Sequence, residues 1–500
     1  MKKQISLIIL LSAFLTATAQ WQMELEEIAD DHDLMGMSVV RVCGSDIESY
    51  HFGLKDYTRQ LVVDDSTMYR IASISKTVTA MGLMNLWEDG AFGLDDDVSA
   101  ALGFELRNPD FPDTPITYRM LLSHQSSIQD GSGYNDFLSA TYSFDATPPS
   151  ISELLTVSGE YYSSNMFRNE EPGTYFAYSN INYGIIGTLI EALSGQRFDI
   201  YMREAVLEPL GIAGSYNVGD IQNIDNVAVL YRYQGGWNPQ ADNYQGVPPV
   251  PLSLQAYQNG TNGVIFAPQG GLRISPTDLA RLLISLQHSS YNGIAILEPA
   301  TIEQMKTVQW AYDGNNGDNY YGLFRSWGLG IQVTTDTSGG DRICAGSTFM
   351  GHPGEAYGLI SDMYWFLNPD TDAGFIFMTN GSGEGFEFGS ESAYYSLEEE
   401  VFADLCNYGF DGCYLGMDER NEAVFRVWPN PADGLVHIKG SEGDQILRCM
   451  NAMGSLFHPD FQEVSDGEFI MDTSELAAGF YYIEILSSAG KLERFPVSIL

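Results

Sequence analysis

The chain has 500 residues, more than one hydrophobic core normally holds, so two or three domains are expected. Its apolar content of 44% is too high for general disorder. The chain has 66 acidic and 24 basic residues. The net charge of −42 repels both nucleic acid and anionic membranes, because a phosphate binder needs a surface rich in lysine and arginine. We therefore expect a soluble protein with no nucleic-acid partner.

The first residues carry a targeting pattern. Two lysines precede an apolar run from Ile5 to Leu15, and the small residues Ala17 and Ala19 follow it. This pattern predicts a secretory signal peptide over residues 1–19, and its apolar run is too short to span a membrane. No later run reaches the about 18 apolar residues of a membrane span. The mature protein is expected to be exported, without stable membrane insertion.

Residues 20–407 mix strand-like and helix-like segments and are expected to form one large domain. Alternating residues in "SVVRVC" and "IESYHFGLK" predict an opening β-hairpin. The next segment, "MYRIASISKTVTAMGLMNLWEDG", predicts a helix that begins near Ser73 and ends at Gly90. Almost every position from Val78 to Trp87 is small or apolar, so this helix should be buried in the middle of the domain.

Two later segments, "NINYGIIGTLIEALSGQ" and "PTDLARLLISLQ", predict further helices, the second with Pro276 at an early helical position. Between them, residues 217–270 are rich in Gly, Asn, Tyr and Pro and predict loops or a lid over a site. The segment "AYGLISDMYWFLNPDTDAGFIFMTNG" holds two apolar runs around a turn and predicts a second hairpin.

The composition changes over residues 408–424, which we interpret as a linker. Residues 425–500 then hold short strand-like runs separated by turn residues, which predict a small all-β sandwich.

Five cysteines are present, at positions 43, 344, 406, 413 and 449. An odd number excludes complete internal pairing, and no CxxC or Cys/His cluster indicates a zinc site. Cys406 and Cys413 flank only "NYGFDG", so they either close a small disulfide loop in an oxidising compartment or remain free structural thiols.

Ser73 and Lys76 stand three residues apart at the head of the predicted buried helix. The same spacing recurs at Ser488 and Lys491, in a turn of the last residues, so spacing alone does not identify a site. A serine hydroxyl needs a base within hydrogen-bond reach, and burial lowers the pKa of a lysine toward usable values. A helix N-terminus also offers free N–H groups where an oxyanion develops. The alternative, a capping serine beside a surface lysine, does not suit so apolar a segment.

Two further motifs follow in order, YSN at residues 178–180 in "PGTYFAYSNINYG" and HPG at residues 352–354 in "MGHPGEAYG". With these the chain resembles the serine β-lactamase, DD-peptidase and esterase superfamily, specifically its class C β-lactamase-like branch, over about residues 30–385. YxN and HxG also occur at residues 257–259 and 51–53, but the residues around these second matches do not resemble the family. Three other segments, "YRIASISKTVTA", "LLSHQSSI" and "GGLRISPTDLARLL", do resemble family segments in the right order.

The resemblance implies an α/β (α+β) fold in which an antiparallel sheet is flanked by helices, with a largely helical subdomain and the site between them. It also implies that Ser73 forms an acyl-enzyme. Lys76 and Tyr178 would share the proton transfers, with the ionised phenol favoured by the neighbouring cation, and which of them is the base stays open. Asn180 would hydrogen-bond the substrate or the lysine.

In the third motif, His352 replaces the commoner lysine of the family. The resemblance implies an oxyanion hole made by the backbone N–H of Ser73 and of Glu355, which follows Gly354. Pro353 has no N–H and stands where β-lactamases carry a hydroxyl. A site with neither that hydroxyl nor the lysine cation is poorly equipped to bind a β-lactam carboxylate, which favours an esterase or peptidase.

His124, in "LLSHQSSI", occupies a position that lines or braces the site in the family, and a packed structural histidine is an equal alternative. The function implied is a secreted serine hydrolase that cleaves an ester or amide, of esterase or D-amino-acid peptidase type. The alternatives are a β-lactamase and a non-catalytic penicillin- or peptidoglycan-binding protein. The substrate would be a small ester, a peptide or a β-lactam-like molecule, and no metal or organic cofactor is implied.

The last residues have a resemblance of their own. "VWPNPADGLVHI" and "DTSELAAGFYYIEI" are similar to the C-terminal sorting domain of type IX secretion. This implies the outer-membrane secretion machinery as a partner and export to the cell surface or medium. A carbohydrate-binding sandwich is the alternative, but the strands lack an aromatic platform beyond Trp428 and the pair at 481–482.

Overall fold

The computed structural model of the chain describes most of residues 21–413 and the strands of a C-terminal unit. The described residues are 21–143, 147–252, 254–368, 371–410, 413, 426–428, 435–439, 445–451, 456–457, 461–465, 468–474, 476, 479–486 and 492–499. The predicted signal peptide, most of the predicted linker, and the Ser488 and Lys491 pair lie outside them. The chain divides into two compact units, Met1–Cys413 and Tyr414–Leu500.

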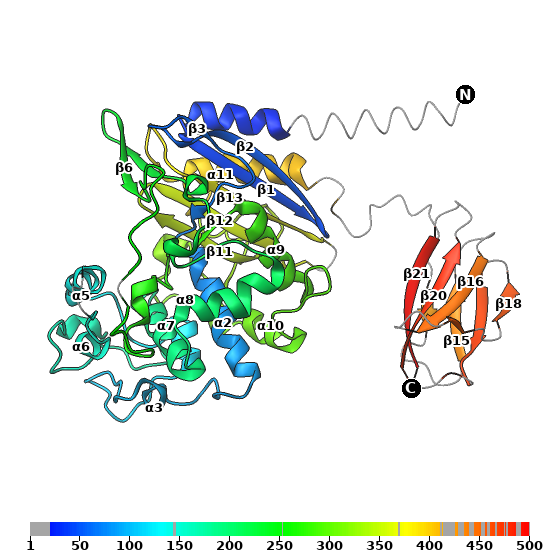
Figure 1. Cartoon of the computed structure of the whole chain (residues 1–500), viewed down its shortest axis with the longest axis horizontal. Coiled ribbons are helices and arrows are strands. Elements are labelled where there is room, and N and C mark those ends of the chain that lie inside the picture. The colour runs from blue at the N-terminus through cyan, green and yellow to red at the C-terminus, as the bar shows by residue number, and fades with distance from the viewer. Residues whose placement is uncertain are drawn as a thin grey trace. The chain divides into compact units, whose positions relative to one another are not determined.

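A nine-stranded antiparallel sheet forms the centre of the first unit (Figure 1). Its order is β3-β2-β1-β13-β12-β11-β10-β9-β8, so strands from the two ends of the unit pair in its middle. The strands are β1 (Gly36–Cys43), β2 (Asp46–Asp56), β3 (Leu61–Val62), β8 (Trp310–Ala311), β9 (Ser326–Trp327), β10 (Gln332–Val333), β11 (Phe349–Ala356), β12 (Leu359–Phe366) and β13 (Ala373–Thr379). Pairing of β1 with β2 and of β12 with β13 confirms both predicted hairpins. Two small sheets pair β4 (Tyr69–Arg70) with β7 (Arg273–Ile274) and β5 (Leu230–Tyr233) with β6 (Trp237–Ala241).

Helices flank this sheet (Figure 1). In chain order they are a helix over residues 21–31, α2 (Ile74–Glu88), α3 (Ser99–Leu102), α4 (Tyr118–Leu122), α5 (Ser132–Tyr142), α6 (Ser152–Leu155), α7 (Asn180–Ser194), α8 (Phe198–Met202), α9 (Pro276–His288), α10 (Pro299–Lys306) and α11 (Ser396–Asp404). The three predicted helices are α2, α7 and α9, and Pro276 stands in the first turn of α9 as expected. No helix among the described residues is both long and apolar enough to cross a membrane.

Side chains of β13 alternate between two hydrophobic cores, because successive residues of a strand point to opposite faces of the sheet. Ile376 and Met378 pack into the core that contains α2, α7 and α9. Phe375 and Phe377 pack into the core that contains residues 21–31 and α11. The central strands β12 and β13 are buried at every residue, so both faces of the sheet are covered, and the predicted fold class is confirmed.

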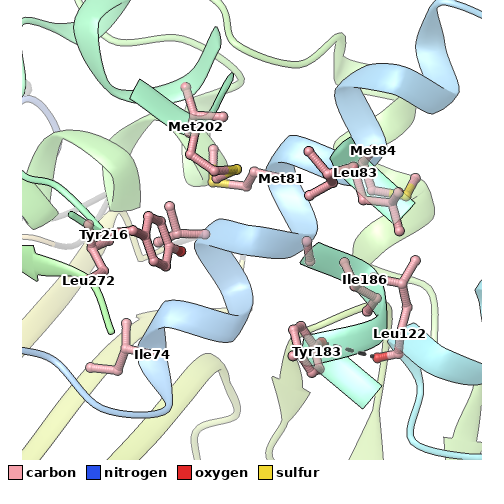
Figure 2. Close-up of a cluster of buried hydrophobic side chains, with 14 of the residues drawn as sticks. Ile74, Met81, Leu83, Met84, Leu122, Tyr183, Ile186, Met202, Tyr216 and Leu272 are labelled. Atoms are coloured by element: carbon pink, nitrogen blue, oxygen red, sulfur yellow. Dashed lines mark hydrogen bonds between the residues drawn. The ribbon is translucent and has the colours of Figure 1, made fainter. Parts of the chain in front are cut away.

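The helix α2 runs through the first of these cores. Every residue from Ile74 to Met84 is buried, as its apolar sequence predicts. Figure 2 shows Leu122, Ile186 and Met202, from three other helices, packed around it. The helix ends where predicted, with Gly90 in the left-handed region at a φ of 74°.

The polar groups of α2 that enter this core have partners. Thr77 Oγ1 donates to the carbonyl of Gly330 at 2.8 Å, and Thr79 Oγ1 donates to the carbonyl of Pro268 at 2.9 Å. Since an unpaired buried hydroxyl costs about 1–3 kcal/mol, these bonds hold two loops against the helix.

Residues 217–270 form loops, as predicted, but they also contain the β5–β6 hairpin. Three short 3-10 turns, η4 (Val218–Asp220), η5 (Ile224–Asn226) and η6 (Gly263–Phe266), complete the segment. Each follows an asparagine whose side chain accepts a backbone N–H two residues further on, at Asn217, Asn223 and Asn262. Three of the asparagines in this segment thus serve to begin turns.

The second unit holds two four-stranded sheets, β14-β15-β19-β18 and β17-β16-β20-β21. Its strands are β14 (Arg426–Trp428), β15 (Leu435–Lys439), β16 (Gln445–Asn451), β17 (Leu456–Phe457), β18 (Phe461–Ser465), β19 (Glu468–Asp472), β20 (Gly479–Leu486) and β21 (Leu492–Ile499). Val436 and Met471 of the first sheet share one core with Cys449 and Ile483 of the second. The two sheets therefore face each other, as the predicted sandwich requires.

Cysteine pairing contradicts both alternatives for Cys406 and Cys413, a small loop between them and free thiols. Cys43 is bonded to Cys413, Cys344 is bonded to Cys406, and Cys449 is free and buried. Cys406 lies in the helical turn η8 (Leu405–Gly409) after α11, whereas Cys413 is bonded to Cys43, the last residue of β1. Neighbours in sequence thus face different parts of the sheet, and the first bond joins positions 370 residues apart.

Peptide mapping tests this pairing. Non-reduced digests should contain Cys43 linked to Cys413 and Cys344 linked to Cys406, as measured by mass spectrometry. Replacing Cys43 and Cys413 together by serine should lower the free energy of unfolding by about 2–4 kcal/mol, because the unfolded chain regains the entropy of a long open loop. Cys449→Ala, in the other unit, serves as the control in denaturant titrations. A Cys406–Cys413 peptide would contradict the pairing.

Candidate active site

Ser73 stands at the N-terminal end of α2. The preceding residue, Ala72, has a φ of 46°, a left-handed conformation that costs a non-glycine residue about 1–2 kcal/mol. Gly354 of β11 packs against this turn, where a Cβ would lie 3.1 Å from the Ser73 nitrogen and 2.9 Å from the Ile71 carbonyl oxygen. The glycine of the third motif therefore allows β11 to approach the first turn of the helix.

Lys76, one helical turn further, is fully buried. Its Nζ donates to Ser73 Oγ, to Asn180 Oδ1 and to the carbonyl of Gln269, each at 2.9 Å. Burial lowers the pKa of Lys76 from 10.5 to about 7, although the charge of Asp130 acts in the opposite direction. A surface lysine beside a capping serine is excluded, since Ser73 makes no side-chain cap to the helix.

Tyr178 lies beside Lys76, with Nζ 4.8 Å from the centre of its ring. Phe324 stacks on the ring at 5.0 Å. Burial raises the pKa of Tyr178 well above 10, and the hydrogen bond with Ser73 lowers it less. The expectation that the lysine cation favours the ionised phenol is wrong, because the loss of water around the hydroxyl outweighs it.

His124 packs beneath Tyr178, with ring centres 4.5 Å apart. Its Nδ1 accepts the backbone N–H of Ser179 at 3.1 Å, so a neutral ring carries its proton on Nε2. Burial, followed by the charge of Lys76, lowers the pKa of His124 well below 6.5. His124 is therefore a buried, packed histidine that contributes to the site by bracing Tyr178.

Asn180 is the first residue of α7. Its Oδ1 accepts from Lys76, while its Nδ2 donates to Asp130 Oδ2 at 2.8 Å. Asp130 also accepts from Ser179 Oγ and from the backbone N–H groups of Asn180 and Ile181, at 2.9–3.1 Å. A carboxylate at a helix N-terminus satisfies N–H groups that lack partners within the helix. Asp130 thus orients Asn180.

His352 of β11 is also fully buried. Its Nε2 lies 3.5 Å from the Tyr178 hydroxyl, and its Nδ1 lies 2.5 Å from the carbonyl oxygen of Pro353. Since a carbonyl only accepts, Nδ1 carries the ring proton and Nε2 is an acceptor. Burial, followed by the charge of Lys76, lowers the pKa of His352 to about 3, so the ring is neutral near pH 7.

The strand β11 pairs with β12 along its whole length, but with β10 only at residues 350–351. The remaining edge is open toward Ser73, and Pro353 loses no ladder bond there. Glu355 follows on the same stretch, and its Oε2 accepts a hydrogen bond from the Tyr395 hydroxyl at 2.9 Å. The oxyanion role of the Glu355 backbone N–H stays a prediction.

Two cavities meet at Ser73, and Asn180 and Glu355 also line both of them. The first has a volume of about 890 Å³, and its aromatic lining comprises Tyr178, Tyr320, Tyr321, Phe324, Phe388, Tyr394 and Tyr395. The second has a volume of about 470 Å³ and a more polar lining that includes Arg70, Asp130, Arg232, Gln269 and Tyr357. The site thus combines an aromatic side with a polar, arginine-containing side.

The structure brings all seven predicted residues together in one site. They are Ser73, Lys76, Tyr178, Asn180, His352, Gly354 and Glu355. Sequence reasoning missed Asp130, Gln269 and Arg70. Asp130 sits in "IQDGSG", which reads as an ordinary turn, and Gln269 contributes only a backbone carbonyl. Arg70, three residues before Ser73, could have been noticed from its place beside the motif. Among the described residues, no group of three or more His, Cys, Asp or Glu side chains could hold a metal ion.

Comparison with known proteins gives the family. The Beta-lactamase family model matches residues 21–398, and the model of the Secretion system C-terminal sorting domain matches residues 426–495. Penicillin-binding protein 4* of Bacillus subtilis (strain 168) is 29% identical over 212 residues, which are 42% of this chain and 44% of that protein. The match therefore spans less than half the length of this curated relative.

Two solved structures share the fold. The octameric penicillin-binding protein homologue from Pyrococcus abyssi has a TM-score of 0.56 at 19% identity, covering 97% of this chain and 96% of its own. The D-amino acid amidase from Ochrobactrum anthropi SV3, complexed with D-phenylalanine, has a TM-score of 0.54 at 20% identity, covering 78% of this chain and 99% of its own. With the family model matched over most of its length, this chain belongs to the Beta-lactamase family and carries a Secretion system C-terminal sorting domain behind that part.

Proposed function

We propose that this protein is an exported serine hydrolase that forms an acyl-enzyme on Ser73. The observation that carries the proposal is the fully buried Lys76, whose pKa is lowered to about 7 and whose Nζ lies 2.9 Å from Ser73 Oγ. A lysine that is partly neutral near pH 7 is a competent proton acceptor for a serine hydroxyl.

The partners of Lys76 direct its lone pair. The protonated amine gives one hydrogen to each of Ser73, Asn180 and Gln269. When the amine loses a proton, the amide oxygen of Asn180 and the carbonyl of Gln269 still require donors, since neither oxygen carries a hydrogen. Only the Ser73 hydroxyl can reverse its bond and donate to Nζ. Deprotonation of Lys76 therefore points its free electron pair at the nucleophile.

Tyr178 acts in this scheme as a neutral hydroxyl. Its raised pKa keeps the proton on the phenol, and the acceptor Nε2 of His352 lies 3.5 Å away. Lys76 then takes the Ser73 proton during attack and returns it to the leaving atom when the scissile bond breaks, while Tyr178 keeps its own proton and donates a hydrogen bond to that atom. Ser73 and Glu355 supply backbone N–H groups for the oxyanion, at the helix N-terminus and the open edge of β11.

The substrate is an ester or an amide, and the enzyme is of esterase or D-amino-acid peptidase type. A neutral His352 and the missing hydroxyl at Pro353 leave no cation at the third motif for a β-lactam carboxylate. The aromatic lining of the first cavity suits an apolar substituent. The fold shared with a D-amino acid amidase supports amides among the candidates. The presence of Ser73, Lys76, Tyr178 and Asn180 disfavours a non-catalytic penicillin-binding protein.

Export rests on two parts of the chain. The sorting domain at residues 426–495 supports delivery across the outer membrane by type IX secretion machinery, and the N-terminal pattern over residues 1–19 supports entry into the periplasm. The hydrolase then acts at the cell surface or in the medium.

Labelling of the nucleophile tests the proposal. A fluorophosphonate or penicillin probe should label the wild type and not Ser73→Ala, and turnover of p-nitrophenyl esters or D-Ala-D-Ala peptides should fall by more than about 10³-fold in that variant. Ser488→Ala, which removes the other Ser-x-x-Lys pair, is the matched control and should keep full labelling. Labelling that survives Ser73→Ala would overturn the mechanism, and labelling without turnover of any substrate would favour the binding protein.

The pH dependence tests the base. If neutral Lys76 accepts the proton, kcat/KM should rise about tenfold per pH unit below pH 7 and level off above it, following the pKa of about 7. Lys76→Met should lower kcat by about 10²–10⁴-fold. His352→Gln distinguishes Lys76 from His352, because a pH dependence caused by this histidine would disappear in the variant. A rate that is independent of pH between about 5.5 and 8 would contradict the assignment, because this range brackets the pKa of Lys76.

A further inference from the structure

Almost all arginines of the first unit are paired with carboxylates. Of the thirteen in the described residues 21–413, ten have a carboxylate oxygen within 4.0 Å. The three that do not are Arg70, Arg232 and Arg325. Two of these three, Arg70 and Arg232, line the second cavity beside Ser73. Two arginines without a carboxylate partner thus share one cavity, and Arg70, the less exposed of them, is the charge that gains most from an anionic ligand.

Arg70 is held through its Nε and through the ring of Tyr357. Its Nε donates to the carbonyl of Gly270 at 3.3 Å, and its Cζ lies 4.8 Å from the ring centre of Tyr357. Among the described residues, Nη1 and Nη2 have no hydrogen-bond acceptor, although the residue is partly buried. The stacked ring and the Nε bond fix the plane, which leaves the two terminal nitrogens as a pre-oriented fork, the geometry that binds a carboxylate through two bonds.

The acids near Arg70 already have partners. Asp242 is held by Arg273 through two hydrogen bonds, at 2.6 and 3.1 Å. Asp130, which also lines this cavity, accepts four hydrogen bonds at the start of α7. Glu355 binds the Tyr395 hydroxyl on the side of the first cavity. The pKa of Arg70 is lowered by burial and then by the charge of Arg273, and the charge of Asp242, which is shared with Arg273, offsets this only in part.

Arg232 adds a second positive charge. It lies in β5, within residues 217–270, and is exposed, in contrast to the partly buried Arg70. No carboxylate within the described part of the chain pairs with it. An exposed arginine at a cavity attracts an anion from solution, while a fixed one determines its final position.

We propose that Arg70, assisted by Arg232, binds a carboxylate of the substrate, so that the enzyme prefers esters or amides carrying a negative charge a few atoms from the bond that Ser73 attacks. This inference rests on the proposed hydrolase function and names its substrate class. The carboxylate would occupy the second cavity, on the arginine side of Ser73, with the apolar part in the aromatic cavity.

Two matched substrate pairs test the preference on either side of the scissile bond. Mono-p-nitrophenyl adipate against p-nitrophenyl hexanoate places the charge in the acyl group, and 3-carboxyphenyl acetate against phenyl acetate places it in the leaving group. For one of the two pairs, the kcat/KM of the anionic ester divided by that of the neutral ester should be about 10- to 100-fold lower in Arg70→Gln than in the wild type. This is the effect expected from the loss of a charge-assisted bidentate contact.

Three variants complete the set. Arg70→Lys keeps the charge without the fork and should retain part of the preference. Arg232→Gln should lower the preference less than Arg70→Gln does, because its side chain is exposed. Arg325→Gln removes the third unpaired arginine, which lies against Tyr312 and lines neither cavity, and should leave the ratio unchanged. An equal loss in Arg325→Gln, or an unchanged ratio in Arg70→Gln for both pairs, overturns the inference.

A binding measurement keeps the test independent of turnover. Benzoate should raise the melting temperature of the wild type and of Ser73→Ala more than the neutral benzamide does, and Arg70→Gln or, if that variant does not fold, Arg70→Lys should reduce the difference. If neutral esters are hydrolysed without an anionic preference and benzoate gives no shift, the carboxylate site is wrong and the hydrolase stands. If no probe labels Ser73, the hydrolase is wrong, and the benzoate shift alone decides on the carboxylate site.

Discussion

Burial of the Lys76 ammonium is the constraint on which the rest of the site depends. Its three acceptors come from separate parts of the chain, Ser73 in α2, Asn180 at the start of α7 and the carbonyl of Gln269. A pKa of about 7 instead of 10.5 corresponds to roughly 5 kcal/mol against the charged form. The acceptors limit that penalty, and in doing so they fix three segments against one another. The core around α2 therefore determines both the position of the helix and the acidity of its lysine.

The same core explains why the neighbours of Lys76 are neutral. Tyr178, His124 and His352 are packed against one another and against aromatic rings, with little water to stabilise a charge. Since the phenol keeps its proton and both imidazoles are neutral, Lys76 is the one of these four groups whose pKa lies near 7. The acid and base roles thus follow from the order in which burial shifts these groups.

Local sequence was sufficient for the elements that carry the site. The apolar run after Ser73 predicted a buried helix, and the family motifs located residues 178–180 and 352–354. Properties that depend on contacts between distant segments could not be predicted in this way. The raised pKa of Tyr178 depends on burial beneath Phe324 and beside His124, and the order of the cysteines along the chain gave no indication that Cys43 meets Cys413.

The third motif and the second cavity differ in charge. The neutral imidazole leaves the third motif without a cation, whereas Arg70 and Arg232 stand unpaired in the cavity on the polar side of Ser73. A carboxylate drawn to the arginines would enter that cavity, which is smaller than the aromatic one. The substrate would then be oriented with its charge away from the third motif, in the direction opposite to one bound by a cation at position 352.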